Sequence, residues 1–269
     1  MKKLLSMMMA LVLIALLLAG CGGSPETTDT PEAGTDKETL TAAANIDYAP
    51  FEFYKDGVAV GFDVDLWNAI CNALGYEAEF VHYPWDGLIS GIQADKFDAI
   101  VADMEVTDER KESVLFSNTY FYETIGICAV KNSDIETEDD LTGQVVGIQT
   151  GTVAESWAKE HQEELGIKEF VAYETMADAI MDLKADRTTA VINNGPYMQY
   201  QATIDPDIKV VAIIDDDPIE CAIAFNQEDA ELCEKVNGAL ADLIADGTYA
   251  ELYEKWFGAE PSEAFRPAE

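Results

Sequence analysis

Short apolar segments alternate with amphipathic stretches along most of this chain, and that alternation limits the folds open to it. Between two apolar segments, at 40–46 and 77–82, hydrophobic residues recur at three- and four-residue spacing up to Gly75. Such spacing predicts an amphipathic helix that ends at the glycine. A second series further along contains a predicted strand at 145–148 and a predicted helix at 153–165. Repeated strand–helix units favour right-handed crossovers and a largely parallel sheet in an α/β fold.

The sequence pattern does not decide how the two series of strands and helices are arranged relative to each other. Extended stretches near 125–130 and 219–225 lie between them, and two predicted helices, 228–246 and 249–257, close the chain. The series could form two independent domains. Alternatively, the closing helices return to the first series, so that the chain crosses twice between two lobes. Periodicity alone allows both arrangements.

The N-terminus has the features of an export signal. Lys2 and Lys3 precede the almost wholly apolar stretch 4–18, and the tetrapeptide Leu-Ala-Gly-Cys ends at Cys21. A basic start, an apolar run of this length and a small-residue cleavage site predict a signal segment over residues 1–20. An uncut transmembrane anchor is the alternative. The tetrapeptide resembles the bacterial lipobox, which implies cleavage before Cys21, lipidation of Cys21 and anchoring on the extracytoplasmic face of the cell membrane.

The segment after this cysteine has the composition of a linker. Residues 22–38 contain Gly, Ser, Thr, Pro, Ala and charged residues but no large hydrophobic side chain. Such a segment cannot bury enough apolar area to offset the entropy lost on ordering. We therefore predict that residues 21–38 form a lipidated, disordered tether.

The charge balance narrows the range of partners. The chain has 52 acidic residues against 16 lysines and arginines, a formal net charge of −36. Long-range repulsion disfavours nucleic acid and anionic lipid as partners. An acidic surface would attract a cationic ligand, but a solvated acidic exterior also keeps an exported protein soluble, and the second interpretation is favoured.

The cysteines allow either disulfides or buried thiols. Besides the predicted lipidation site, the chain contains Cys71, Cys128, Cys221 and Cys233. In an exported protein these four permit two disulfides in three pairings, and buried free thiols are the alternative. Their spacing matches no zinc-binding pattern, and only two histidines are present to help. No metal site is expected.

Ten short motifs occur in a fixed order between about residue 40 and residue 258. They are YAPFEF from Tyr48, GFDVDL from Gly61, WDGL from Trp85, FDAI from Phe97, TDERK from Thr107, FSNTYF from Phe116, DLTG from Asp140, QTGT from Gln149, ADGTY from Ala245 and YEKWF from Tyr253. In this order they resemble the family 3 extracellular solute-binding proteins, the polar amino acid-binding lipoproteins of ATP-driven (ABC) importers. One such motif would be weak, but the ordered set is highly specific.

The resemblance implies a two-lobed, type II periplasmic-binding-protein-like α/β fold, with two hinge strands and a ligand cleft between the lobes. Lobe one would comprise 39–130 plus 220–258, lobe two 131–219, and a tail 259–269. The closing helices would pack on lobe one. The implied function is capture of a small polar ligand, in the first place an amino acid, by a monomer that then docks on a membrane permease. No cofactor and no catalytic residue are expected.

Family positions that grip the ligand carboxylate match residues on both lobes. Arg110 matches the carboxylate-binding arginine, a role that suits its planar guanidinium. Thr150 and Thr152 match the start of the lobe-two helix, where backbone N–H groups and the helix dipole favour an anion. Tyr48 and Trp85 match aromatic positions that pack on the ligand side chain.

Two residues depart from the family pattern. Asn194 stands where most relatives carry the aspartate that neutralises the ligand ammonium, and Glu105 stands where they usually carry Ser or Thr. One hypothesis is that Glu105 has taken over the cation-binding role. The alternative is that Glu105 pairs with Arg110 and the natural ligand is not a standard α-amino acid. Asn45 and Asp103, with nearby Asp47, are further possible cleft residues, which mildly favours a cationic or neutral polar ligand.

Two other function classes remain open. Cyclohexadienyl dehydratases resemble binding proteins closely, and Glu105 is a conceivable acid or base for such an enzyme. A sensory protein that presents its ligand to a receptor is the other possibility. No nucleophile–base pair is evident in the sequence, so a binding protein is the preferred interpretation.

Overall fold

The computed structural model describes residues 37–267. The predicted signal segment 1–20, the predicted lipidation site Cys21 and residues 21–36 of the predicted tether lie outside the described residues, as does the end of the predicted tail. Within the part of the chain that is described, we find no helix both long enough and apolar enough to cross a membrane.

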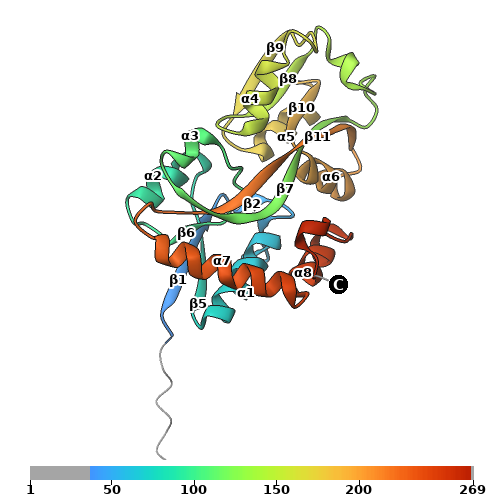
Figure 1. Ribbon diagram of the computed structural model, residues 1–269. Helices are drawn as coiled ribbons and strands as arrows, with labels where there is room; N and C mark the ends of the chain where they lie inside the picture. Colours follow the sequence, from blue (N-terminus) through green and yellow to red (C-terminus); the bar gives the residue numbers. More distant parts are fainter. Residues whose placement is uncertain (1–36, 268–269) are drawn as a thin grey trace, which may run out of the picture. The chain divides into compact units, whose positions relative to one another are not determined.

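The main sheet contains eight strands in the order β5-β1-β6-β11-β7-β10-β8-β9, and β2, β3 and β4 form a small second sheet (Figure 1). The strands are β1 (Thr39–Ala44), β2 (Asp47–Tyr48), β3 (Glu52–Lys55), β4 (Val58–Val60), β5 (Glu77–His82), β6 (Ala99–Ile100), β7 (Leu115–Val130), β8 (Val145–Gln149), β9 (Glu169–Tyr173), β10 (Ala190–Asn194) and β11 (Ile208–Phe225).

Each end of the sheet is parallel and its middle is antiparallel. Strand β1 pairs in parallel with β5 and β6, and β8 pairs in parallel with β9 and β10. The two long strands β7 and β11 pair with each other and with their outer neighbours in antiparallel fashion. The predicted parallel units are therefore present on both sides, but the whole sheet is mixed.

Strands β7 and β11 are the links between the two series. Figure 1 shows both running from the group of elements around β1 to the group around β8. Their pairing register shifts between Ile214 and Ile219, next to Pro218, which has no N–H to donate to the ladder. Ile125, Ile127 and Ala129 of β7 pack with the second series. The exact lobe limits given above stay a prediction.

Helices cover both faces of the sheet. They are α1 (Phe62–Leu74), α2 (Leu88–Gln93), α3 (Asp108–Lys111), α4 (Val153–Glu160), α5 (Met176–Lys184), α6 (Gly195–Ile204), α7 (Ala230–Ala245) and α8 (Thr248–Phe257), with 3-10 turns η1 (Trp85–Gly87), η2 (Glu138–Leu141) and η3 (Glu263–Phe265). Gly75 ends α1 in the left-handed conformation, as its position predicted. Helix α4 ends five residues earlier than expected, because the chain continues in turns to Gly166, which has φ 64°.

The closing helices return to the first series. Phe62 of α1 lies against Tyr249 and Phe257 of α8, with ring centroids 5.6 and 5.3 Å apart. Val236 and Leu240 of α7 belong to the same buried cluster. The alternative of two independent domains is therefore wrong.

The four cysteines of the described region are buried and free. They lie in the packed interior, where a thiol behaves as a small apolar side chain.

Candidate functional site

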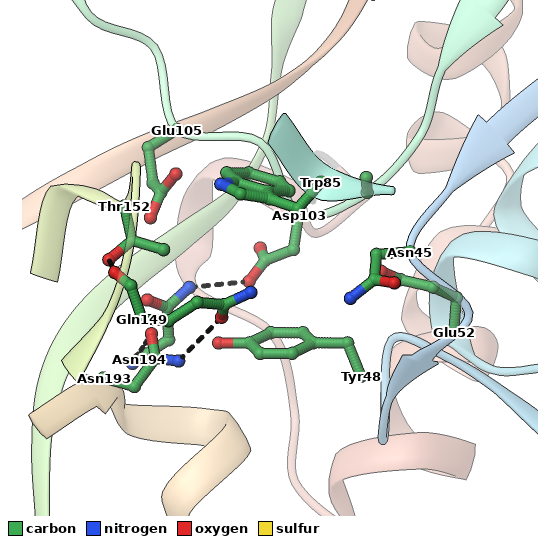
Figure 2. A pocket seen from close by; sticks show the side chains of 11 residues that line it. Asn45, Tyr48, Glu52, Trp85, Asp103, Glu105, Gln149, Thr152, Asn193 and Asn194 are labelled. Carbon is green, nitrogen blue, oxygen red and sulfur yellow. Dashed lines mark hydrogen bonds between the residues drawn. The ribbon is translucent and has the colours of Figure 1, made fainter. Parts of the chain in front are cut away.

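A narrow cavity lies where the two series meet, lined by side chains from both (Figure 2). Its lining consists of Asn45, Tyr48, Glu52, Trp85, Ala102, Asp103, Glu105, Gln149, Thr152, Asn193 and Asn194. Most of these residues follow the carboxyl ends of β1, β6, β8 and β10 or sit on them. The edge formed by such strand ends is where open α/β sheets place their ligands.

Asp103 is held in the cavity by an unusual backbone conformation. Its φ is 47°, in the left-handed region that a non-glycine residue rarely adopts. Its backbone N–H lies 2.7 Å from Asp63 Oδ2 and 3.1 Å from the Tyr120 hydroxyl, and the side chain is 2% exposed. Asn194 Nδ2, from the second series, donates to Asp103 Oδ2 at 3.0 Å. Figure 2 shows this contact between the two sides of the cavity.

Arg110 lies next to the cavity but does not line it. Its Nη1 donates to Glu105 Oε2 and to the Glu105 backbone oxygen, both at 2.7 Å. Its Nη2 donates to the Gly151 oxygen at 3.0 Å, and its guanidinium carbon lies 5.2 Å from the Trp85 ring centroid. The guanidinium is thus engaged by the chain itself.

The second series contributes neutral polar groups. The Gln149 side chain donates to the Glu174 oxygen at 3.2 Å and accepts from Asn193 Nδ2 at 3.3 Å. Thr152 caps α4: its hydroxyl accepts from the Glu155 N–H at 3.0 Å and donates to the Gln149 oxygen at 2.9 Å. These bonds hold the amides and the hydroxyl in fixed positions.

Aromatic rings border the cavity on the first side. Tyr48 stacks on Tyr197 of α6, with centroids 4.4 Å apart and planes 14° apart. The Trp85 indole N–H donates to the Gly151 oxygen at 3.2 Å, which is a third hydrogen bond between the two series. Asn45 donates to Asp47 Oδ1 at 2.7 Å, at the rim next to Tyr48.

Several buried carboxyl groups lie at or behind the cavity. Burial, reinforced by Glu123, Asp63 and Glu105, raises the pKa of Asp103 well above its ordinary value. Burial also raises the pKa of Glu123 to about 8 and that of Asp63 to about 7. The pKa of Glu52 is raised well above its ordinary value, again chiefly by burial. The cluster therefore retains protons near neutral pH.

The structure brings most of the predicted residues together. Asn45, Tyr48, Trp85, Asp103, Glu105, Thr152 and Asn194 line the cavity. Arg110 and Thr150 do not, because Arg110 is turned toward Glu105 and Gly151, and Thr150 is exposed after β8. Their roles in ligand binding stay predictions.

Four lining residues were missed by the sequence reasoning, namely Glu52, Ala102, Gln149 and Asn193. Glu52 belongs to the motif YAPFEF and Gln149 to the motif QTGT, so the motifs themselves indicated that these residues could lie near the ligand. Asn193 precedes Asn194 at the end of a buried strand, where both side chains can turn toward the strand-end edge. Ala102 offers no polar group and no signal.

Comparisons with known proteins agree with this geometry. The chain is 32% identical over 262 residues to the arginine-binding extracellular protein ArtP of Bacillus subtilis (strain 168), covering 97% of this chain and 100% of that protein. An ancestral arginine-binding protein bound to arginine matches with a TM-score of 0.77 and 33% identity, over 83% of this chain and 100% of that one. An ancestral amino acid-binding protein, described as a precursor of cyclohexadienyl dehydratase, matches with a TM-score of 0.73 and 35% identity, over 81% and 95%.

These structural neighbours share the two-lobed α/β fold of amino acid-binding proteins, and the relatives are named as binding proteins. Residues 40–259 match the profile of the bacterial extracellular solute-binding proteins, family 3. The match covers most of the chain and includes both series of strands and helices. The protein is therefore a member of family 3 of the bacterial extracellular solute-binding proteins.

Proposed function

We propose that this protein is the lipid-anchored binding subunit of an ABC importer, which captures a small polar ligand outside the cell and delivers it to a membrane permease. The ligand is an amino acid or a closely related nitrogen compound. Family membership and the name of the arginine-binding relative support the ligand class. The tetrapeptide ending at Cys21 supports the anchor.

One observation carries the capture mechanism: the cavity is lined by both series of strands and helices, which are the first and second halves of the folded body. Asp103 meets Asn194 across it, and Trp85 and Arg110 of the first half both donate to the Gly151 oxygen of the second. A ligand that touches both halves binds the closed arrangement more tightly than an open one. It therefore shifts the population toward the closed form, which docks on the permease.

A thermal-shift screen of the full-length protein in detergent tests the proposal. Amino acids, amines and small carboxylates form the panel, and neutral sugars serve as the control. A ligand present at a hundred times its Kd stabilises the fold by about 2.7 kcal/mol, so a clear rise in melting temperature is expected for at least one nitrogen compound. Small-angle scattering should then show a smaller radius of gyration with that compound. If no nitrogen compound raises the melting temperature, the proposal is wrong.

The anchor has its own test. In cells fed labelled palmitate, the parent protein should incorporate label and fractionate with the membrane, and Cys21→Ser should do neither. Cys233→Ser is the matched control, because that thiol is buried in the folded body. Equal labelling of the parent and Cys21→Ser would exclude lipidation at this position.

An enzyme of the dehydratase type is the second candidate, favoured by two observations. A structural neighbour is described as a precursor of cyclohexadienyl dehydratase, and raised carboxyl pKa values suit a general acid. Against it, the substrates prephenate and arogenate have a net negative charge, which the acids lining this cavity disfavour, whereas a neutral or basic amino acid has none. Incubation with either substrate should therefore give no aromatic product. A measurable turnover would favour the enzyme.

A further inference from the structure

The guanidinium assigned to a ligand carboxylate is already paired with a carboxylate of the chain. Arg110 Nη1 lies 2.7 Å from Glu105 Oε2, and the side chains are 11% and 3% exposed. Nη1 also donates to the Glu105 backbone oxygen, and Nη2 donates to the Gly151 oxygen. A ligand carboxylate would have to displace Glu105 from this nearly buried pair, which is strongly unfavourable.

The N-terminus of α4, the other group assigned to that carboxylate, is also satisfied from within. Glu155 Oε2 accepts the Gly151 N–H at 2.7 Å, and its other oxygen lies 2.6 Å from Lys159 Nζ. The Thr152 hydroxyl is used by the Glu155 N–H and the Gln149 oxygen. A negative charge thus already stands at this helix end, where a second would be repelled.

The cavity presents acids and no base. Glu52, Asp103 and Glu105 line it and are at most 2% exposed, and no Lys, Arg or His lies among its described lining residues. Within residues 37–267, Glu52 Oε2 has no hydrogen-bond partner, and Asp103 Oδ1 has none apart from the Glu123 carboxyl, which bonds to Asp103 when one of the two is protonated. Figure 2 shows the Asp103 carboxylate projecting into the cavity between Trp85 and Tyr48. An unpartnered buried carboxylate oxygen is costly, and a cationic N–H donor would satisfy it.

We propose, building on the function proposed above, that the ligand is a small organic cation with amine or guanidinium N–H donors and no free carboxylate. Asp103 Oδ1 accepts from the cation, while Asn194 holds Oδ2. The rings of Tyr48 and Trp85 border the cation, a contact that suits its charge. Asp103, and not Glu105, is thus the cation-binding acid, because Glu105 is committed to Arg110.

Matched pairs of compounds that differ only in a carboxylate test this selectivity directly. Agmatine and arginine, cadaverine and lysine, and putrescine and ornithine would be titrated into the full-length protein by calorimetry. We expect at least one amine to bind about 100-fold more tightly than its amino acid. The reason is that the carboxylate of the amino acid would be desolvated in the cavity without a cationic partner.

The outcomes separate the two proposals. If an amino acid binds as tightly as its amine, or if only a neutral amino acid binds, the inference on ligand class is overturned and the proposed capture function stands. If none of the compounds in the wider nitrogen panel binds, the proposed function itself fails.

Two variants locate the determinants. Glu105→Gln frees the Arg110 guanidinium and should narrow the agmatine-to-arginine affinity ratio by about tenfold or more. Glu109→Gln removes the same charge from an exposed position beside Arg110 and should leave the ratio unchanged. Asp103→Asn should weaken agmatine binding about 100-fold with circular dichroism and melting curves like those of the parent. Parent-like agmatine binding by Asp103→Asn would overturn the assignment of Asp103.

Discussion

The two sides of the cavity differ in chemistry. The first half contributes the carboxyl groups of Glu52, Asp103 and Glu105, whereas the second contributes the neutral side chains of Gln149, Thr152, Asn193 and Asn194. The acids are forced into the interior and have raised pKa values or a buried ion-pair partner. The amides and the hydroxyl are satisfied by ordinary hydrogen bonds.

This difference suggests a division of labour. A buried charge discriminates strongly between ligands, because an uncompensated charge in a low-dielectric site is costly. Neutral amides discriminate less between ligands, but their desolvation costs little free energy when the halves close. This suits the half that moves against the first as the cavity opens and closes. The first half would therefore select the ligand by its charge, and the second would retain the bound ligand through neutral hydrogen-bonding groups.

The largest expected effect is a loss of stability with rising pH that originates in the first half. The pKa of Glu123 is raised from 4.5 to about 8 and that of Asp63 from 3.8 to about 7, chiefly by burial. At any pH between the unfolded and the folded pKa values, the folded protein therefore binds more protons than the unfolded chain. The unfolding free energy is therefore highest below the unfolded pKa values and falls as pH rises to about 7 for Asp63 and about 8 for Glu123, with roughly 4 kcal/mol of the loss above pH 6.

Urea unfolding of the full-length protein between pH 6 and 8.5 measures this loss, because ordinary surface carboxyls are already ionised there. Groups facing the cluster are Asp103 and Glu105 after β6, Tyr48, Tyr120 of β7 and Cys221 of β11. Glu123→Gln keeps the acceptor for the Thr124 N–H and should flatten the profile. An unfolding free energy that stays constant or rises over this range would contradict the assignment.

The same protons link pH to ligand affinity. A cation that binds the ionised form of the Asp103–Glu123 pair must release a proton, since burial and mutual repulsion keep one on the pair. Affinity for an amine should therefore increase with pH, by up to about tenfold per unit between pH 6 and 8. Calorimetry in buffers of different ionisation enthalpy counts the released protons. Affinity that is independent of pH would mean that the cation does not meet these carboxyls.

The fold could be predicted well from local pattern, but the long strands could not. Strand 77–82 and the stop at Gly75 follow from alternation and glycine conformation, and both are present in the structure. Strands β7 and β11 were recognised only near their ends, because residues 115–124 and 208–218 contain polar and charged residues without clear alternation. Their pairing is set by tertiary contacts between distant segments.

The site residues were recognised by motif, but most of their contacts were not. For Glu105 the sequence left two roles open, binding of a cationic ligand group or a pair with Arg110, and the structure has the pair. Glu123 was accessible in principle, because it is the single charged residue of the stretch 115–130. The hydrogen bond from Asn194 to Asp103 joins residues 91 positions apart and required the assembled halves.

A smaller effect is expected for the second half, from Asn194→Ala. This change removes the donor to Asp103 Oδ2 without altering charge, so it should weaken binding of the preferred cation about tenfold. The loss should be well below that caused by Asp103→Asn, if the first half dominates selection. Asn132→Ala, at an exposed position of the second half, is the control and should bind like the parent. Equal losses for Asn194→Ala and Asp103→Asn would remove the contrast between the two sides.

The smallest effect concerns closure itself, through Trp85→Phe. Phenylalanine keeps an aromatic face toward the cavity but cannot donate to the Gly151 oxygen, a bond of 3.2 Å at an exposed edge. Because a solvent-accessible neutral hydrogen bond contributes about 0.5 to 1 kcal/mol, affinity should fall roughly threefold, and the change should lie mainly in the dissociation rate. Stopped-flow measurements of ligand release would show it. If the association rate fell instead, Trp85 would control ligand entry to the cavity. Retention of the ligand would then not depend on its bond to the Gly151 oxygen of the second half.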